Sequence, residues 1–259
     1  MRVAGVGFNC IDIYENLQKS YPTGNSVDFI IHMSRFGMET SMISVVGSDK
    51  HGEWLREVLR KEKVDISHLH VEEGDTAIFK MDLNGKDRVH KEKVAGVMES
   101  FALTDEDIAF ALEHEVIHTN LSGNSIELLP LFRSKGIRVV FDFTTKVNSI
   151  PEFILPHVDY AFFSYDQDDI PILEYMKWAQ ALGPDIVVVT LGEKGSIAYD
   201  GQSFFREGIC KVPVVNTVGA GDSFCAGFMY SILRGSSIPD ALRKGAETAA
   251  MVVAKFEPY

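Results

Sequence analysis

The sequence has few cysteines and no recognisable cysteine pattern. Only Cys10, Cys210 and Cys225 occur in 259 residues, and none belongs to a Cys-x-x-Cys pair or a Cys/His cluster. Neither a disulfide framework nor a zinc site is therefore expected, and we predict no metal ligands among the site residues. Such scattered cysteines are typical of a reducing compartment, so we predict a cytoplasmic protein.

Basic residues and long apolar runs are also scarce. Lys and Arg total 25 against 37 Asp and Glu, a net charge of −12, which argues against a nucleic-acid partner. No stretch approaches the ~18 apolar residues of a membrane span. The apolar stretch Val3 to Phe8 is short and has no basic region before it, so it predicts a strand rather than a signal peptide. We expect one globular domain over residues 1–259, with no membrane partner.

Short β-rich runs alternate with longer helical patterns, which is typical of a mainly parallel sheet covered by helices on both faces. Several of the runs are apolar throughout, as strands buried on both sides should be. The predicted strands are Val3 to Phe8, Thr40 to Val46, Val116 to Thr119, Arg138 to Asp142, Tyr160 to Phe163 and Ile186 to Leu191. The predicted helices include Glu53 to Lys63, Ile126 to Lys135 and Asp168 to Leu182.

Two segments interrupt this alternation. Residues 10–17 alternate apolar and polar side chains, and residues 74–94 predict a hairpin that turns at Asn84-Gly85. Strands that interrupt an α/β sheet usually form a separate small sheet, whose exposed face and edges need a cover. We expect these segments to form a lid over a cleft, and a homodimer that shares the lid is one way to cover it.

The most informative motif lies between Asn216 and Phe224 and precedes an apolar helix that runs to about Leu233. Small residues at Gly219, Ala220 and Gly221 allow backbone N–H groups to approach an anion at the N-terminus of that helix. Asp222 in the first turn could take a proton from an attacking hydroxyl group. The structural alternative is a helix start after a glycine turn, where Asp is favoured without any chemistry.

The residues from Thr217 to Phe224, followed by Gly227, resemble the C-terminal signature of the PfkB (ribokinase-like) carbohydrate kinases. Further matches to this family are spread along the chain. They are Gly7 with Asp12, Gly24-Asn25, Gly47 with Asp49 and Gly52, Thr76, and Thr190-Leu191-Gly192 with Gly195. The resemblance implies a three-layer α/β/α sandwich with a mainly parallel central sheet and a small β-lid.

The resemblance also implies residue roles and a cofactor, ATP. Asp222 would be the catalytic base, and the backbone of Gly219, Ala220 and Gly221 would form the anion hole. The implied substrate-binding residues are Asp12, Gly24, Asn25, Asp28 and Arg88. The implied residues beside the nucleotide are Thr190, Gly192 and Gly195.

The sequence departs from the family pattern where cations are expected. Asn216 replaces a usual Asp that helps to bind a monovalent cation, so potassium activation is not a firm expectation. Ser164 and Gln167 replace the Asn and Glu of an element that orders magnesium and phosphates. They can form hydrogen bonds but supply no charge, whereas Mg²⁺ prefers carboxylate and phosphate oxygens. Two alternatives follow: Asp166, Asp168 or Asp169 supplies the missing charge, or Mg²⁺ arrives mainly with ATP. Asp142 at a strand end is a further candidate for the phosphate side.

Asp28 replaces a common Asn of the family in the sugar region. An added carboxylate would favour a substrate that carries an amine, because an opposite charge in a partly dry site binds more strongly than a neutral group. The structural alternative is an Asp that faces solvent at a helix start and interacts only with the helix dipole. Asp12 likewise has two interpretations, a ligand for sugar hydroxyls at a strand end or a turn cap.

The resemblance thus implies transfer of the ATP γ-phosphoryl group to a primary hydroxyl of a sugar or sugar-amine conjugate, most specifically the 6-hydroxyl of fructoselysine. One alternative is a kinase for another ketose or a nucleoside, for which Phe79 is the lid aromatic that could stack on a base. The other is a sugar-binding regulator without catalysis, suggested by Ser164, Gln167 and Asn216.

Overall fold

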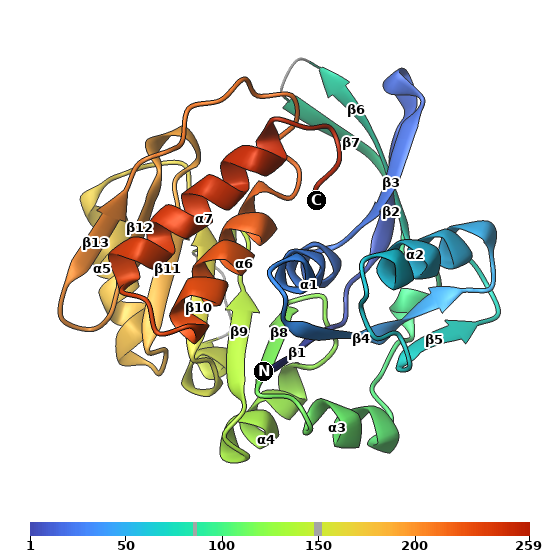
Figure 1. The fold of residues 1–259 in the computed structure, drawn as a ribbon, viewed down its shortest axis with the longest axis horizontal. Helices are drawn as coiled ribbons and strands as arrows, with labels where there is room; N and C mark the ends of the chain where they lie inside the picture. The colour runs from blue at the N-terminus through green and yellow to red at the C-terminus, as the bar shows by residue number, and fades with distance from the viewer. Residues whose placement is uncertain (85–86, 148–151) are drawn as a thin grey trace.

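The computed structural model describes residues 1–84, 87–147 and 152–259, apart from the side chains of residues 84, 87, 88 and 90. Over these ranges the chain forms a large sheet of nine strands with helices on both faces (Figure 1). In order across the sheet, the strands are β13 (Phe204–Glu207), β12 (Ser196–Tyr199), β11 (Ile186–Thr190), β10 (Tyr160–Ser164), β9 (Arg138–Asp142), β8 (Val116–Asn120), β1 (Arg2–Val6), β4 (Glu39–Gly47) and β5 (Leu69–Glu72).

The pairing in this sheet is parallel from β5 to β11, and only β12 and β13 at the far edge pair antiparallel. Strands β1 and β11 are buried almost throughout, which is why their sequences are nearly continuous apolar runs. All six predicted strands are confirmed, and so is the predicted α/β architecture. The short strands β5, β12 and β13 were not predicted, because four residues carry too little of a pattern to be recognised.

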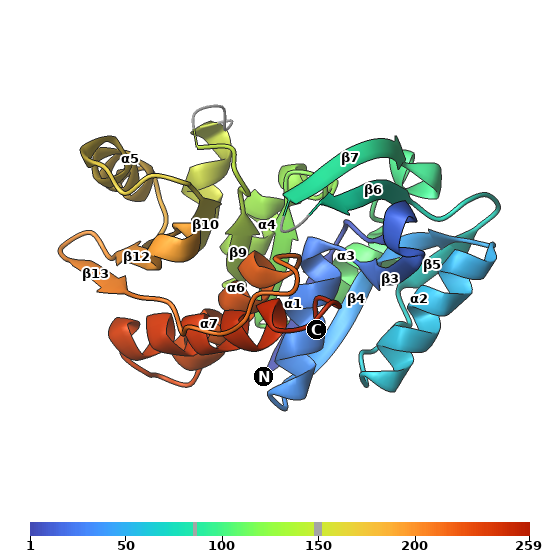
Figure 2. The same ribbon diagram turned by 90° about the horizontal axis from the view of Figure 1, so that it is seen from above.

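The helices form one layer on each face of the sheet. One face packs against α1 (Asn25–Arg35), α2 (Lys50–Lys61), α6 (Ala220–Leu233) and α7 (Ile238–Val253). The other face packs against α3 (Asp105–Ala111), α4 (Leu129–Ser134) and α5 (Ile170–Ala181). Figure 2 shows α5 and α7 on opposite sides of the sheet. Short 3-10 helices lie in the connections: η1 (Glu15–Leu17), η2 (Gly96–Glu99), η3 (Ile126–Leu128), η4 (Glu152–His157) and η5 (Gly192–Lys194).

The predicted helices are present with adjusted ends. The predicted helix from Ile126 to Lys135 begins as the 3-10 turn η3, and its α-helical part starts only at Leu129. Pro130 explains the boundary, because a proline has no N–H to donate and is tolerated only in the first turn of an α-helix.

A second sheet of four strands projects beside the large one in the order β3-β2-β6-β7, within the described residues (Figure 1). Its strands are β2 (Cys10–Tyr14), β3 (Lys19–Thr23), β6 (Ile78–Asn84) and β7 (Asp87–Val94). Both segments predicted to leave the large sheet belong to it. Strand β3 was not predicted, and it contains Pro22, which an edge strand tolerates. The last pair of the β6–β7 hairpin joins Asn84 to Asp87, so Asn84 belongs to a strand, and Gly85 of the predicted turn lies outside the described residues.

Among the helices of the described ranges, none combines the length and the hydropathy needed to cross a membrane.

Helices α6 and α7 approach closely at a glycine. A Cβ on Gly227 of α6 would lie 2.4 Å from Oγ1 of Thr248 and 2.8 Å from the carbonyl oxygen of Lys244, both on α7. Thr248 already donates its hydroxyl to that same carbonyl oxygen at 2.7 Å, so neither atom can move away freely. The position of α6, and of the residues at its N-terminus, therefore depends on this glycine.

We expect Gly227→Ala to destabilise the protein by about 1–3 kcal/mol, because the added methyl group overpacks the helix interface. The steric cost outweighs the gain of about 1 kcal/mol that Ala normally brings to a helix. Urea unfolding measures the change. Gly208→Ala is the matched control, because a Cβ there meets no atom within 4 Å. Equal unfolding free energies for the two variants would contradict the proposed close contact.

Candidate active site

The N-termini of two long helices meet at the edge of the large sheet where its parallel strands end. Helix α1 follows Gly24, whose carbonyl oxygen accepts the amide of Asp28 at 2.8 Å. Helix α6 follows Gly219 and packs beside α1 (Figure 1). Unpaired N–H groups and the positive ends of two helix dipoles thus gather in one place, which favours negative charge there.

The loop before α6 keeps the conformation that the motif predicts. Gly219 has a φ of 70° in the left-handed region, and a Cβ there would lie 2.5 Å from Cβ of Pro258. Its carbonyl oxygen accepts the amide of Ser223 at 2.9 Å, which starts the helix. Ala220 and Gly221 follow in the first turn, and the partly exposed Asp222 stands beside them. A carboxylate and the backbone of a helix start therefore lie side by side.

Asn25 connects Asp222 to a second carboxylate. Its Nδ2 donates to Oδ1 of Asp222 at 3.0 Å and to Oδ2 of Asp142 at 2.8 Å. Asp142 ends strand β9, and its Oδ1 accepts the amide of Thr144 at 2.7 Å. Burial raises the pKa of Asp142 to about 6, although both hydrogen bonds oppose the shift. The expected place of Asp142 on the phosphate side stays a prediction, and the structure adds a direct contact with Asn25, the residue that holds Asp222.

Asp12 and Asp28 extend the acidic cluster toward the small sheet. Asp28 is 1% exposed, so the alternative in which it faces solvent is wrong. Burial raises its pKa well above the usual value, Asp222 and then Asp12 add to the rise, and a hydrogen bond from Thr23 opposes it. Asp12 on β2 is 6% exposed. Four carboxylates therefore surround this end of α1, and among the described side chains none of the groups that shift the pKa of Asp28 is a cation.

Asn216 fastens the loop before α6 to the small sheet. Its Nδ2 donates to the carbonyl oxygen of Phe256 at 3.0 Å and approaches the hydroxyl groups of Tyr14 and Tyr21 at 3.5 and 3.4 Å. Its Oδ1 accepts the amide of Val218 at 3.2 Å. Both ends of this buried amide are engaged inside the protein, so its evident role is structural, and a contact with a cofactor stays a prediction.

The other predicted residues lie farther along the same sheet edge. Ser164 and Thr190 end β10 and β11 as register partners, and their hydroxyl oxygens are 3.1 Å apart. Gly192 and Gly195 lie in and after η5, directly beyond β11. Gln167 is exposed in the loop after β10. The structure thus brings Ser164 together with Thr190, while Gln167 lies in the exposed loop beyond β10.

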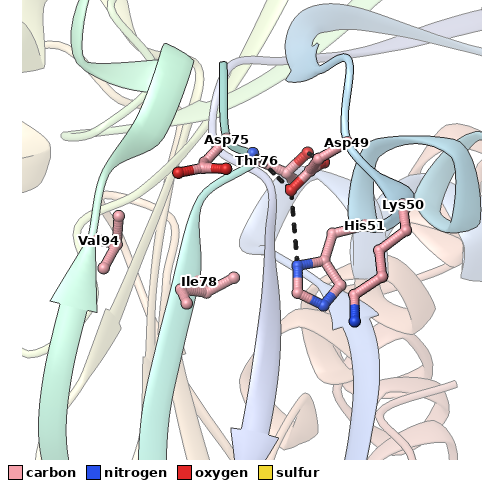
Figure 3. A pocket seen from close by; sticks show the side chains of 7 residues that line it. All are labelled: Asp49, Lys50, His51, Asp75, Thr76, Ile78 and Val94. Atoms are coloured by element: carbon pink, nitrogen blue, oxygen red, sulfur yellow. Dashed lines mark hydrogen bonds and ion pairs between the residues drawn. The ribbon is translucent and has the colours of Figure 1, made fainter.

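A cavity of about 330 Å³ lies on the opposite face of the small sheet (Figure 3). Strands β6 and β7 contribute Ile78 and Val94, and the start of α2 contributes Asp49 and His51. In a strand, neighbouring side chains point to opposite faces, so this cavity is separate from the face that carries Asp12. The N-cap carboxylate of Asp49 accepts the hydroxyl of Thr76 at 2.6 Å, which connects α2 to the segment just before β6.

Most of the predicted substrate residues converge, and the connection through Asn25 to Asp142 was missed. Residues 25, 142 and 222 are far apart in the sequence, and only their common place at helix starts and a strand end could have suggested contact. Arg88 lies on β7, but its side chain is outside the described part of the structure.

The chain is similar in sequence to two sugar kinases. A fructoselysine 6-kinase of Escherichia coli is 38% identical over 252 residues, covering 97% of each chain. A fructosamine kinase of Bacillus subtilis is 32% identical and covers 96% of this chain and 90% of its own.

The fold is similar to that of solved kinases. The Arabidopsis thaliana ribokinase complexed with ribose and ATP superposes with a TM-score of 0.84 at 20% identity, covering 97% of this chain and 92% of its own. The aminoimidazole riboside kinase of Salmonella enterica gives a TM-score of 0.74 at 18% identity, covering 99% and 94%. The model of the pfkB family of carbohydrate kinases matches residues 19–259, and the chain belongs to that family.

Proposed function

We propose that this protein transfers the γ-phosphoryl group of ATP to the 6-hydroxyl of fructoselysine. The observation that carries the proposal is the acidic cluster, in which Asp222 stands at an anion-binding helix start and Asp12 and Asp28 stand beside it. The family supports sugar phosphorylation with ATP, and the names of two relatives of 32% and 38% identity support a sugar joined to an amine.

In the proposed reaction, Asp222 accepts the proton of the acceptor hydroxyl as its oxygen attacks the γ-phosphorus. The N–H groups of Gly219, Ala220 and Gly221 stabilise the charge that develops on the phosphoryl oxygens. Asn25 holds the Asp222 carboxylate by a hydrogen bond of 3.0 Å and is itself held by Asp142. Asp222 is therefore positioned before the substrate arrives, which lowers the entropic cost of reaching the reactive geometry.

The amine of the acceptor balances the charge of Asp28. Oδ1 of Asp28 is a buried oxygen without a hydrogen-bond partner among the described residues. A buried carboxylate oxygen is costly to leave unpaired. The secondary ammonium group of a fructosamine supplies both a positive charge and N–H donors, whereas fructose supplies neither the charge nor the same donors.

ATP binds in this proposal along the sheet edge beyond Asp142, where Thr190, Gly192 and Gly195 lie. The residues present fit a magnesium ion held by phosphates, because Ser164 and Thr190 offer neutral hydroxyl groups that can bind its water ligands. No group of three or more His, Cys, Asp or Glu side chains suited to a metal occurs in the described ranges. When bound, Mg²⁺ neutralises phosphate charge.

The small sheet is the lid of the proposed single kinase domain. Closing it over the acceptor excludes water, which would otherwise accept the phosphoryl group and hydrolyse ATP. Its other face carries the partly buried Ile78 and Val94 above the cavity of Figure 3. A homodimer in which two lids pack together would cover these apolar side chains.

We expect Asp222→Asn to lower kcat by about 10²–10⁴-fold, because the amide cannot accept the proton. ADP release with ATP, Mg²⁺ and fructoselysine measures the loss, and fructose, ribose and adenosine test the other acceptor classes. Asp240→Asn is the matched control, because Asp240 occupies the first turn of α7. Full activity of Asp222→Asn would overturn the assigned base, and turnover only on another acceptor would overturn the substrate.

Asp142→Asn should stabilise the free protein in a pH-dependent way. The pKa of Asp142 is raised to about 6, so the ionised form costs stability above that pH, and the cost disappears as pH falls toward the ordinary Asp pKa of about 4. After the loss of one hydrogen bond, we expect a net gain of about 1–2 kcal/mol at pH 8 that shrinks between pH 6 and 4.

Melting temperatures across that pH range check this expectation, with the exposed Asp185→Asn as the control. A gain that is the same at pH 4 and pH 8 would show that ionisation of Asp142 is not its cause. The same variant should lose activity at pH 8, because Asn25 then lacks one of its two carboxylate acceptors.

The variant Asp28→Asn tests whether Asp28 recognises the amine of the acceptor. We expect kcat/KM for fructoselysine to fall about tenfold, while kcat/KM for fructose changes little, because only the first substrate loses an opposite charge. Competition between the two sugars in wild type and variant measures the change in preference. An equal loss for both sugars would mean that Asp28 serves the structure and does not distinguish the amine.

A further inference from the structure

Three side chains form a row across the cleft face of the small sheet. Asp12 of β2 is the register partner of Phe79 of β6, and Phe79 is the register partner of Lys93 of β7. Register partners on adjacent strands point to the same face. The irregularity in the β6–β7 pairing comes after this row, between Lys80 and Met81, so it does not disturb the row. On this face of the sheet, the ring of Phe79 thus lies between the buried carboxylate of Asp12 and the exposed side chain of Lys93.

The ammonium group of Lys93 is held over aromatic rings at the outer end of the row. Its Nζ lies 5.3 Å from the ring centre of Phe79 and 6.0 Å from that of Phe8, and these two rings pack edge to face at 5.7 Å. No carboxylate of a described side chain forms an ion pair with Lys93, in contrast to Lys80 and Lys91 of the same sheet, which have acidic partners.

Electrostatics also places Lys93 in the same neighbourhood as the acidic cluster. Burial raises the pKa of the Cys10 thiol, Asp12 and Asp28 raise it further, and Lys93 lowers it. Asp222 and Asp12 both raise the pKa of Asp28, so the three carboxylates lie near one another. In the register of the small sheet, Lys93 lies beyond Asp12 on the other side of Phe79.

This order matches the chemistry of a fructosamine made from an amino acid. The reacting hydroxyl and the secondary ammonium group stand at opposite ends of the sugar, followed by the four-carbon stem of the lysine part and its α-carboxylate. Adjacent strands are about 4.8 Å apart, so the backbones of Asp12 and Lys93 are separated by about 10 Å. A stem that starts at Asp12 and crosses the rings of Phe79 and Phe8 ends within reach of Lys93.

We propose that Lys93 binds the α-carboxylate of the amino-acid part of the acceptor, so that the enzyme selects sugar conjugates of amino acids over those of simple amines. Phe79 and Phe8 provide the apolar surface for the stem between the two charged contacts. The inference rests on the proposed function and adds a specificity-determining residue to it. Lys93 does not touch the reacting atoms and is not a catalytic residue.

The test compares fructoselysine with its α-carboxamide, which differs only in the charge of the group that Lys93 contacts. We expect Lys93→Gln to raise KM for fructoselysine about threefold to tenfold with little change in kcat. This is the effect expected when one hydrogen bond between a partly exposed ammonium group and a carboxylate is lost. KM for the carboxamide should be the same in variant and wild type. Lys80→Gln is the matched control, because Lys80 lies on the opposite face of the sheet and pairs with Glu92.

The outcomes separate this inference from the proposed function. Suppose that wild type phosphorylates fructoselysine. If Lys93→Gln then raises KM equally for both substrates, or leaves KM unchanged for both, the carboxylate contact is overturned and the proposed function remains. If wild type phosphorylates neither conjugate, the proposed acceptor is overturned and this inference falls with it. Melting curves of the variant confirm that a raised KM does not come from unfolding.

Discussion

Like charges in a confined space are the constraint on which the site depends. Asp12, Asp28, Asp142 and Asp222 gather where α1 and α6 begin, and burial leaves little water to separate their charges. Such a cluster would be unstable at a random place in a protein. It persists here because two helix N-termini point at it and because Asn25 offers both N–H groups of its amide to two of the carboxylates.

The same constraint explains why the residues fall into two classes. Asp142 and Asp222 are joined by hydrogen bonds within the protein, so their positions are set in the absence of a ligand. Asp28 keeps a buried oxygen without a partner in the described structure, and its pKa is raised by burial and by its acidic neighbours. A site of this kind gains most from a ligand that brings a positive charge. Preference for an amine conjugate is then a consequence of an incomplete charge balance.

Sequence patterns predicted the local parts of the molecule better than the contacts between them. The buried strands and the loop from Gly219 to Asp222 were recognised because each depends on a pattern of consecutive residues. The bridge from Asp142 through Asn25 to Asp222 was missed because it depends on the order of strands in the sheet, which no local pattern specifies. The structural engagement of Asn216 was missed for the same reason, since its partners Tyr14 and Tyr21 come from the other end of the chain.

The register of the small sheet links recognition to closure. The parallel pairing of β2 with β6 places Asp12 beside Phe79, and the antiparallel pairing of β6 with β7 places Phe79 beside Lys93. A shift of one residue in either pairing would send one of these side chains to the other face, toward Ile78 and Val94. In the proposed reaction, the sheet that excludes water is therefore also the sheet that binds two charged groups of the acceptor, its secondary ammonium group and its α-carboxylate. An acceptor that lacks one of those groups gives less binding energy to hold the lid closed. The enzyme would therefore discriminate between acceptors in the step that closes the lid.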